Sequence, residues 1–170
     1  MLKYSFISKN EKETQELAAL VISYLKPSSV VLLTGDLGAG KTTFVSGALR
    51  KLGYNDHVVS PTFNILKCYF EVTPNVFHID AYRLEDQNHE IGLEEFIEGN
   101  GITFIEWPAF IKELIPTEHT NIEITRIDDN KRSIVISDET DINKDLFRAL
   151  EERWCIVYYL IVLTSTYLLV

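Results

Sequence analysis

The chain has 170 residues, of which 46% are hydrophobic and 24% are charged, and its formal net charge at pH 7 is −9. This length and composition predict one globular domain with a substantial core, and they exclude wholesale disorder. The acidic balance argues against a protein that grips RNA or DNA by itself, because neutralising phosphates requires Lys and Arg.

The first quarter of the chain predicts a helix. Ser8 and Glu11 have the S-x-x-E spacing of a capping box. Apolar residues then recur at helical spacing from Leu17 to Leu25, and Pro27 ends the pattern. We therefore expect an amphipathic helix that begins near Glu11.

A strand, a glycine-rich loop and a second helix follow. Val30 to Thr34 is a short apolar run, as expected of a strand buried on both faces. Lys41 to Leu52 predicts a helix, and Gly53 is well placed as its C-terminal cap.

Two strands are predicted in the middle of the chain. Ser60-Pro61 breaks the preceding pattern, and a strand is expected from Phe63 to Phe70. A turn at Thr73 to Asn75 leads into a second short strand, Val76 to Asp80, which ends in an acid.

The remaining elements complete an α/β pattern. The segment 88–98 predicts a helix with Asn88 as a possible cap, and Ile102 to Glu106 predicts a buried strand that Pro108 ends. Asn121 to Ile127 and Arg132 to Ser137 alternate around a polar turn, which indicates a hairpin. Strands mixed with helices in this way predict an α/β fold with a largely parallel sheet.

The loop between the first strand and the second helix matches the phosphate-binding pattern G-x-x-x-x-G-K-[ST] as Gly35-Asp36-Leu37-Gly38-Ala39-Gly40-Lys41-Thr42. Glycines let main-chain N–H groups approach phosphate oxygens, and a helix N-terminus favours an anion. Lys41 is expected to reach the β- and γ-phosphates, and the Thr42 hydroxyl to ligate Mg²⁺. Thr43 can contact the α-phosphate or simply sit in the first helical turn. The alternative is a glycine-rich turn that only joins strand to helix.

Two carboxylates are expected beside this loop. Asp80 and Glu106 each end a short apolar strand, and ligands of parallel sheets lie beyond the carboxyl ends of the strands. We predict that Glu106 faces Mg²⁺ and that Asp80 polarises the attacking water or contacts the outer shell of the metal. The division of roles between the two acids stays open, and either can instead cap a loop.

Further candidates surround the two acids. Ser60 and Thr62 lie where a loop can sense the γ-phosphate, although an ordinary turn is the alternative. His78 shares the strand face of Asp80, and a structural role is favoured for it. Trp107 is expected to point away from the metal if its strand continues.

Five segments together resemble the TsaE (YjeE) family of bacterial ATPases of tRNA threonylcarbamoyladenosine biosynthesis: GDLGAGKTTF, SPTFNILKCY, HIDAYRL, IGLEEF and ITFIEWP. The resemblance runs from about residue 3 to residue 137. It implies a P-loop NTPase-like, three-layer fold in which antiparallel hairpins extend a mostly parallel central sheet.

The resemblance also implies the activity, the cofactors and the partners. It implies Mg²⁺-dependent hydrolysis of ATP, with Lys41, Asp80 and Glu106 as catalytic residues and Thr42 and Glu106 as metal ligands. Glu11 and Arg132 would belong to the adenine pocket. The partners would be a threonylcarbamoyl transferase and a protein related to it, which would hold the tRNA, so that this chain meets tRNA only indirectly.

Residues 138–170 depart from the family pattern, so the predicted division is an ATPase domain at 1–137 and an acidic, helix-prone segment with an apolar tail at 138–170. The uncharged tail at 154–170 is near the lower limit of a membrane span. Membrane contact is not favoured over packing, self-association or an extension without a role.

The expected location is the cytoplasm. The N-terminus lacks the apolar segment of a signal peptide. Cys68 and Cys155 lack metal-ligand spacing and are expected to be reduced thiols.

Three other functions compete with the regulatory ATPase. A small P-loop kinase would usually carry an arginine-rich lid, and no arginine cluster follows the glycine loop. A GTP switch would carry an N-K-x-D signature, which is absent. A nucleotide-binding scaffold without turnover would not need both Asp80 and Glu106.

Overall fold

The computed structural model describes residues 2–85, 92–140 and 142–153. Its elements in chain order are β1 (Leu2–Ser8), α1 (Glu11–Ile22), β2 (Val30–Thr34), α2 (Lys41–Lys51), β3 (Leu66–Tyr69), β4 (Val76–Asp80), η1 (Ala81–Leu84), α3 (Glu94–Ile97), β5 (Ile102–Glu106), η2 (Pro108–Leu114), β6 (Thr120–Arg126) and β7 (Arg132–Asp138). Residues 144–153 then form a further helix.

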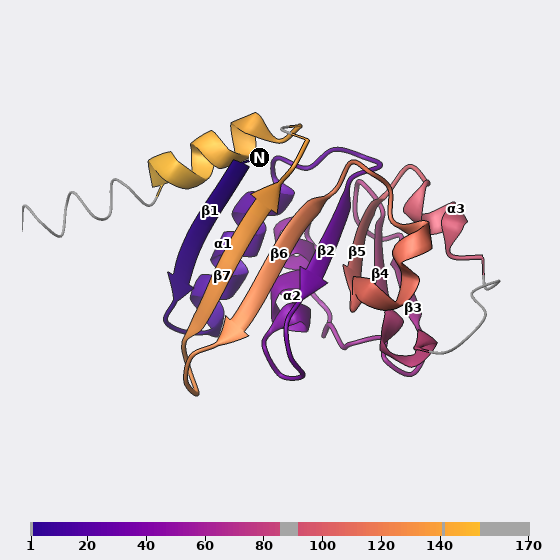
Figure 1. Ribbon diagram of the computed structural model, residues 1–170, viewed down its shortest axis with the longest axis horizontal. Helices are drawn as coiled ribbons and strands as arrows, with labels where there is room; N and C mark the ends of the chain where they lie inside the picture. Colours follow the sequence, from indigo (N-terminus) through magenta and orange to yellow (C-terminus); the bar gives the residue numbers. More distant parts are fainter. Residues whose placement is uncertain (1, 86–91, 141, 154–170) are drawn as a thin grey trace, which may run out of the picture.

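A seven-stranded sheet with the order β1-β7-β6-β2-β5-β4-β3 forms the middle layer (Figure 1). The strands β6, β2, β5 and β4 run parallel, whereas β1, β7 and β3 pair antiparallel with their neighbours. This arrangement confirms the predicted α/β class with a mostly parallel centre. It also brings the carboxyl ends of β2, β4 and β5 to one edge of the sheet.

Helical segments cover both faces of the sheet. In Figure 1, α1 and α2 lie behind it, and they pack on a core that includes Val31 and Leu33 of β2. The other face is covered by η1, α3 and η2, which contact Val30 and Leu32. Because β2 is buried on both faces, its sequence is continuously apolar rather than alternating.

The entry into α1 differs from the predicted capping box. Asn10, not Ser8, is the N-cap, and its side-chain oxygen accepts a hydrogen bond from the Glu13 N–H at 3.0 Å. Ser8 is the last residue of β1 and pairs with Arg132 of β7. It cannot cap the helix because it belongs to a strand that the sequence reading did not predict.

Two predicted elements are shorter than expected. The strand expected at 63–70 pairs with β4 only from Leu66, because the N–H groups of Asn64 and Ile65 both donate to the carbonyl of Pro61 and close a turn. Of the helix expected at 88–98, the structure describes residues 92–98, and within these the helix α3 begins at Glu94. The expected cap Asn88 lies outside the described residues.

The helix-prone segment after residue 137 is helical at 144–153. Leu146, Phe147 and Leu150 from this helix are buried in the same core as α1 and α2. Asp138 accepts a hydrogen bond from the Asn143 N–H at 3.1 Å, and the Asn143 side chain donates to Thr120 at 2.9 Å. These bonds attach the helix to the sheet, and the division of the chain at residue 137 stays a prediction.

Within the described ranges, no helix combines the length and apolar character needed to cross a membrane. The tail at 154–170 and Cys155 lie outside those ranges. Cys68 of β3 is a free cysteine.

Candidate functional site

The glycine-rich loop joins β2 to α2 in a conformation that only glycine adopts easily. Gly35, Gly38 and Gly40 have φ angles of 136°, 76° and 112°. A Cβ added at Gly35 would lie 2.1 Å from the Ile124 carbonyl oxygen, so a side chain is excluded there. Gly40 is the N-cap of α2, and no side chain caps this helix end. The first N–H groups of α2 are therefore available to an anion.

A pocket of about 420 Å³ opens in front of this helix end. Its lining comes from the loop, from the ends of β4 and β5, and from the segment before β3. The lining residues are Leu37, Gly38, Gly40, Lys41, Thr42, Thr43, Ser60, Thr62, Asp80, Tyr82, Glu106 and Trp107. The carboxyl ends of the parallel strands thus form the pocket, as the sequence predicts.

Lys41 is almost completely buried and lies across the loop. Its Nζ donates to the carbonyl oxygens of Gly35 at 2.8 Å and Asp36 at 3.0 Å, and it lies 3.9 Å from Glu106 Oε2. Burial lowers the pKa of Lys41, and the negative charges of Glu106, Asp80 and Asp36 oppose this effect.

Glu106 contacts both the start of α2 and the neighbouring strand β4. Its Oε1 accepts a hydrogen bond from the Thr42 hydroxyl at 3.0 Å, and it also lies 2.9 Å from Nε2 of the fully buried His78. A hydroxyl and a carboxylate therefore meet at the first turn of α2. These are the oxygen donors that Mg²⁺ prefers in proteins, and the pair fits that metal.

Asp80 is also buried, and both of its carboxylate oxygens accept hydrogen bonds. Its Oδ2 accepts from the hydroxyls of Ser60 at 2.9 Å and Thr62 at 2.6 Å. Its Oδ1 accepts from the Tyr82 N–H at 3.0 Å. Ser60 and Thr62 thus fix the Asp80 carboxylate at the wall of the pocket, directly opposite Glu106 in the β4–β5 register.

The direction expected for Trp107 required its strand to continue, and this condition is not met. The strand ends at Glu106, and Trp107 takes the left-handed conformation with φ of 59° before Pro108. Its ring therefore turns toward the site, where Lys41 Nζ lies 4.3 Å from the ring centroid. The sequence reading also missed Tyr82, whose ring lies 5.1 Å from that of Trp107.

Glu11 and Arg132 lie together in a second, smaller pocket of about 180 Å³ that continues from the loop. Gly40 and Thr43 contribute to both pockets. Arg132 Nε donates to the carbonyl of Ala39 at 2.8 Å, so this side chain also braces the loop. Every site residue predicted from the sequence therefore lies in the loop or in one of these two adjoining pockets.

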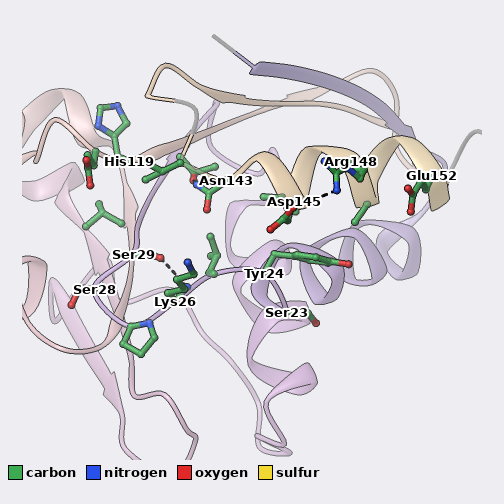
Figure 2. Close-up of a pocket in the computed structure, with 18 residues that line it drawn as sticks. Ser23, Tyr24, Lys26, Ser28, Ser29, His119, Asn143, Asp145, Arg148 and Glu152 are labelled. Carbon is green, nitrogen blue, oxygen red and sulfur yellow. Dashed lines mark hydrogen bonds and ion pairs between the residues drawn. The ribbon is translucent and has the colours of Figure 1, made fainter.

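A larger cavity, about 760 Å³, lies elsewhere (Figure 2). It is lined by the segment between α1 and β2, by residues before β6 and by the helix at 144–153. Figure 2 shows Lys26, His119, Arg148 and Glu152 spread around it rather than converging. It lies at the amino ends of β2 and β6, whereas ligands of parallel sheets bind at the carboxyl ends. We therefore place the candidate site at the smaller pockets.

Comparisons with known proteins identify the family of the chain. A sequence model of the family described as "Threonylcarbamoyl adenosine biosynthesis protein TsaE" matches residues 8–134. The chain belongs to the TsaE family. The matched range includes the glycine loop, both strand-end acids, Glu11 and Arg132.

Several TsaE relatives resemble the chain over most of its length. The tRNA threonylcarbamoyladenosine biosynthesis protein TsaE of Bacillus subtilis (strain 168) is 41% identical over 128 residues, which cover 75% of this chain and 81% of the relative. The protein of that name from Rickettsia bellii (strain RML369-C) is 40% identical over 142 residues, covering 82% and 98% respectively. The crystal structure of YdiB from Bacillus subtilis superposes with a TM-score of 0.77 at 32% identity, covering 89% of this chain and 96% of YdiB.

Proposed function

We propose that this TsaE family member is a Mg²⁺-dependent ATPase of tRNA threonylcarbamoyladenosine biosynthesis. The observation that carries the proposal is the 3.0 Å bond between Thr42 and Glu106 at the uncapped start of α2. It joins a candidate phosphate-binding helix end to a candidate metal ligand in one pocket. The names of the relatives supply the pathway.

Each side chain has a distinct proposed role. Loop N–H groups hold the phosphates, and Lys41 exchanges its bonds with the loop carbonyls for bonds to the β- and γ-phosphates. Thr42 and Glu106 hold Mg²⁺, which when bound neutralises charge on the phosphates. Asp80, oriented by Ser60 and Thr62, positions the attacking water. Glu11 and Arg132 border the pocket proposed for the adenine.

The proposed partners are a threonylcarbamoyl transferase and a protein related to it. Because the chain carries a net charge of −9, these partners rather than the chain itself would bind the tRNA. ATP hydrolysis would act on the partner complex rather than on the tRNA. The cytoplasm, where tRNA is modified, is the proposed location.

The test is phosphate release from Mg²⁺-ATP by the wild type and by Lys41→Ala, each with and without the two partners. We expect Lys41→Ala to lower turnover about 10²–10³-fold, because it removes a cation aimed at the phosphates. Lys26→Ala, in the cavity of about 760 Å³, is the matched control and should leave turnover unchanged. The partners should raise the wild-type rate only.

Other outcomes would select a different function. Equal turnover in Lys41→Ala would refute the site. Equal use of GTP would favour a GTPase, and tight binding of ATP without turnover in any partner mixture would favour a scaffold. Transfer of the γ-phosphate to an acceptor other than water would favour a kinase.

A further inference from the structure

His78 is a buried polar side chain whose role the proposed function leaves open. It lies in β4 with no exposed surface, and its Nε2 is 2.9 Å from Glu106 Oε1. Its other ring nitrogen, Nδ1, has no hydrogen-bond partner among the residues that the structure describes. Among the residues that the structure describes, Glu106 is therefore the one hydrogen-bond partner of this ring.

The direction of the bond follows from the chemistry of the two groups. A carboxylate only accepts hydrogen bonds, so His78 Nε2 must carry the proton that it shares with Glu106. In the neutral ring Nδ1 is then a bare acceptor. A buried acceptor without a partner destabilises a fold, so an apolar residue of similar volume would suit this position better if packing were its only role.

The other contacts of Glu106 come from residues that the nucleotide would engage. Oε1 is shared with the Thr42 hydroxyl, and Oε2 faces Lys41 Nζ at 3.9 Å. Under the proposed function, both Thr42 and Lys41 turn toward the nucleotide and its metal. His78 approaches Glu106 from β4, within the sheet, so its bond does not compete with a ligand in the pocket.

We infer that His78 is a positioning residue that holds the Glu106 carboxylate in its metal-binding orientation. The inference rests on the proposed function. Deleting the donor leaves Glu106 without its fixed partner, so the carboxylate loses its preferred orientation when Thr42 turns away. Loss of such a partner to a metal-binding carboxylate typically weakens metal affinity about 10–100-fold.

The test compares His78→Met, which keeps volume without the donor, with His78→Gln, whose side-chain amide can donate from a position near that of Nε2. Calorimetry measures binding of the non-hydrolysable analogue AMPPNP with and without Mg²⁺. We expect His78→Met to weaken binding at least about 10-fold with Mg²⁺ and to leave binding without Mg²⁺ unchanged. His78→Gln should bind close to the wild type in both conditions.

Thermal unfolding of the same variants separates positioning from a structural role. His78→Met removes the unpaired Nδ1 but also the hydrogen bond to the buried Glu106, and because these two effects oppose each other the melting temperature should change little. A lower melting temperature with unchanged affinity would overturn the inference. So would an equal loss of affinity without Mg²⁺, or a Gln variant as weak as the Met variant.

The wild type and Lys41→Ala complete the experiment and keep the two proposals distinguishable. If the wild type binds AMPPNP with Mg²⁺ and Lys41→Ala does not, the nucleotide site stands whatever the His78 variants do. If the wild type does not bind, the proposed function and the inference about His78 both fall.

Discussion

Each end of the parallel strands carries a cavity. The cavity at the amino ends is the larger, whereas the one at the carboxyl ends gathers buried charged side chains. At the amino ends lies a cavity of about 760 Å³ with charged groups spread around its rim. At the carboxyl ends lies a pocket of about 420 Å³. Into it point Lys41, Asp80 and Glu106, all nearly inaccessible to solvent and each bonded to protein groups.

The difference shows that a larger volume does not go with a denser cluster of buried charges in this fold. Buried charges are costly unless they are paired and hydrogen-bonded, so three of them gathered at one edge require a reason beyond stability. The glycine loop supplies that reason if the pocket takes phosphates. The exposed charges around the larger cavity carry no such cost. Three predictions test this contrast.

The largest expected effect separates the two cavities by one matched substitution in each. Glu106→Gln should lower Mg²⁺-dependent ATP hydrolysis about 10²–10³-fold, because it removes the charge proposed to hold the metal. Glu118→Gln, at the rim of the larger cavity, should leave hydrolysis unchanged. Steady-state phosphate release measures both. A comparable loss in Glu118→Gln would show that the larger cavity takes part in the reaction.

The second prediction is that the helix at 144–153, beside the cavity at the amino ends of the strands, contributes to stability. Leu150 is fully buried in the helix at 144–153, so Leu150→Ala should lower the free energy of unfolding by about 2–5 kcal/mol. Arg148→Ala, two residues away with a side chain 71% exposed, should change it by less than about 0.5 kcal/mol. Urea denaturation measures the difference. ATP hydrolysis below the unfolding transition should be the same in both variants, and a selective loss in Leu150→Ala would contradict the division of roles.

The smallest effect concerns the β6–β7 turn, which lies beside the glycine-rich loop. Asp128 accepts hydrogen bonds from the N–H groups of Lys131 at 2.7 Å and Asn130 at 2.9 Å, and these bonds lower its pKa from 3.8. Its contribution to stability is therefore full above pH 3.8 and is lost as the pH falls through the lowered value. Asp128→Ala should unfold more easily than the wild type at neutral pH, and the gap should close in acid.

Denaturation curves at neutral and at strongly acidic pH measure this gap, and Asp129→Ala in the same turn is the control. Asp129 accepts one hydrogen bond from the exposed Arg126 side chain, so its substitution should matter less. A gap for Asp128→Ala that persists in acid would show that its charge is not the cause.

The parts of the fold that the sequence predicts are those whose physics is local. The strand at Val30–Thr34 and the helix from Lys41 follow from an apolar run and a glycine loop, and Gly53 ends the helix with the expected positive φ of 96°. In contrast, β1 depends on a partner far along the chain, since Leu2 pairs with Asp138. No local sequence pattern predicts such a pairing. Ser8 was expected to cap the helix because β1, the strand to which it belongs, was not predicted.

The same distinction applies to the site. The glycine loop and the two strand-end acids could be placed from spacing and strand direction alone. The bond from His78 to Glu106 could not, because it depends on how neighbouring strands align. The actual direction of the Trp107 ring could not be predicted, because a left-handed conformation at a residue other than glycine is uncommon and nothing in the sequence indicates it.

The hydrogen bond from Arg132 to the Ala39 carbonyl joins residues 93 positions apart and connects the β6–β7 hairpin to the glycine-rich loop. During synthesis, the whole glycine motif therefore leaves the ribosome well before the side chain that braces it. A nascent or shortened chain without β7 would carry an intact motif on an unbraced loop. If the loop binds a nucleotide as proposed, nucleotide affinity would report whether β7 has docked beside β6.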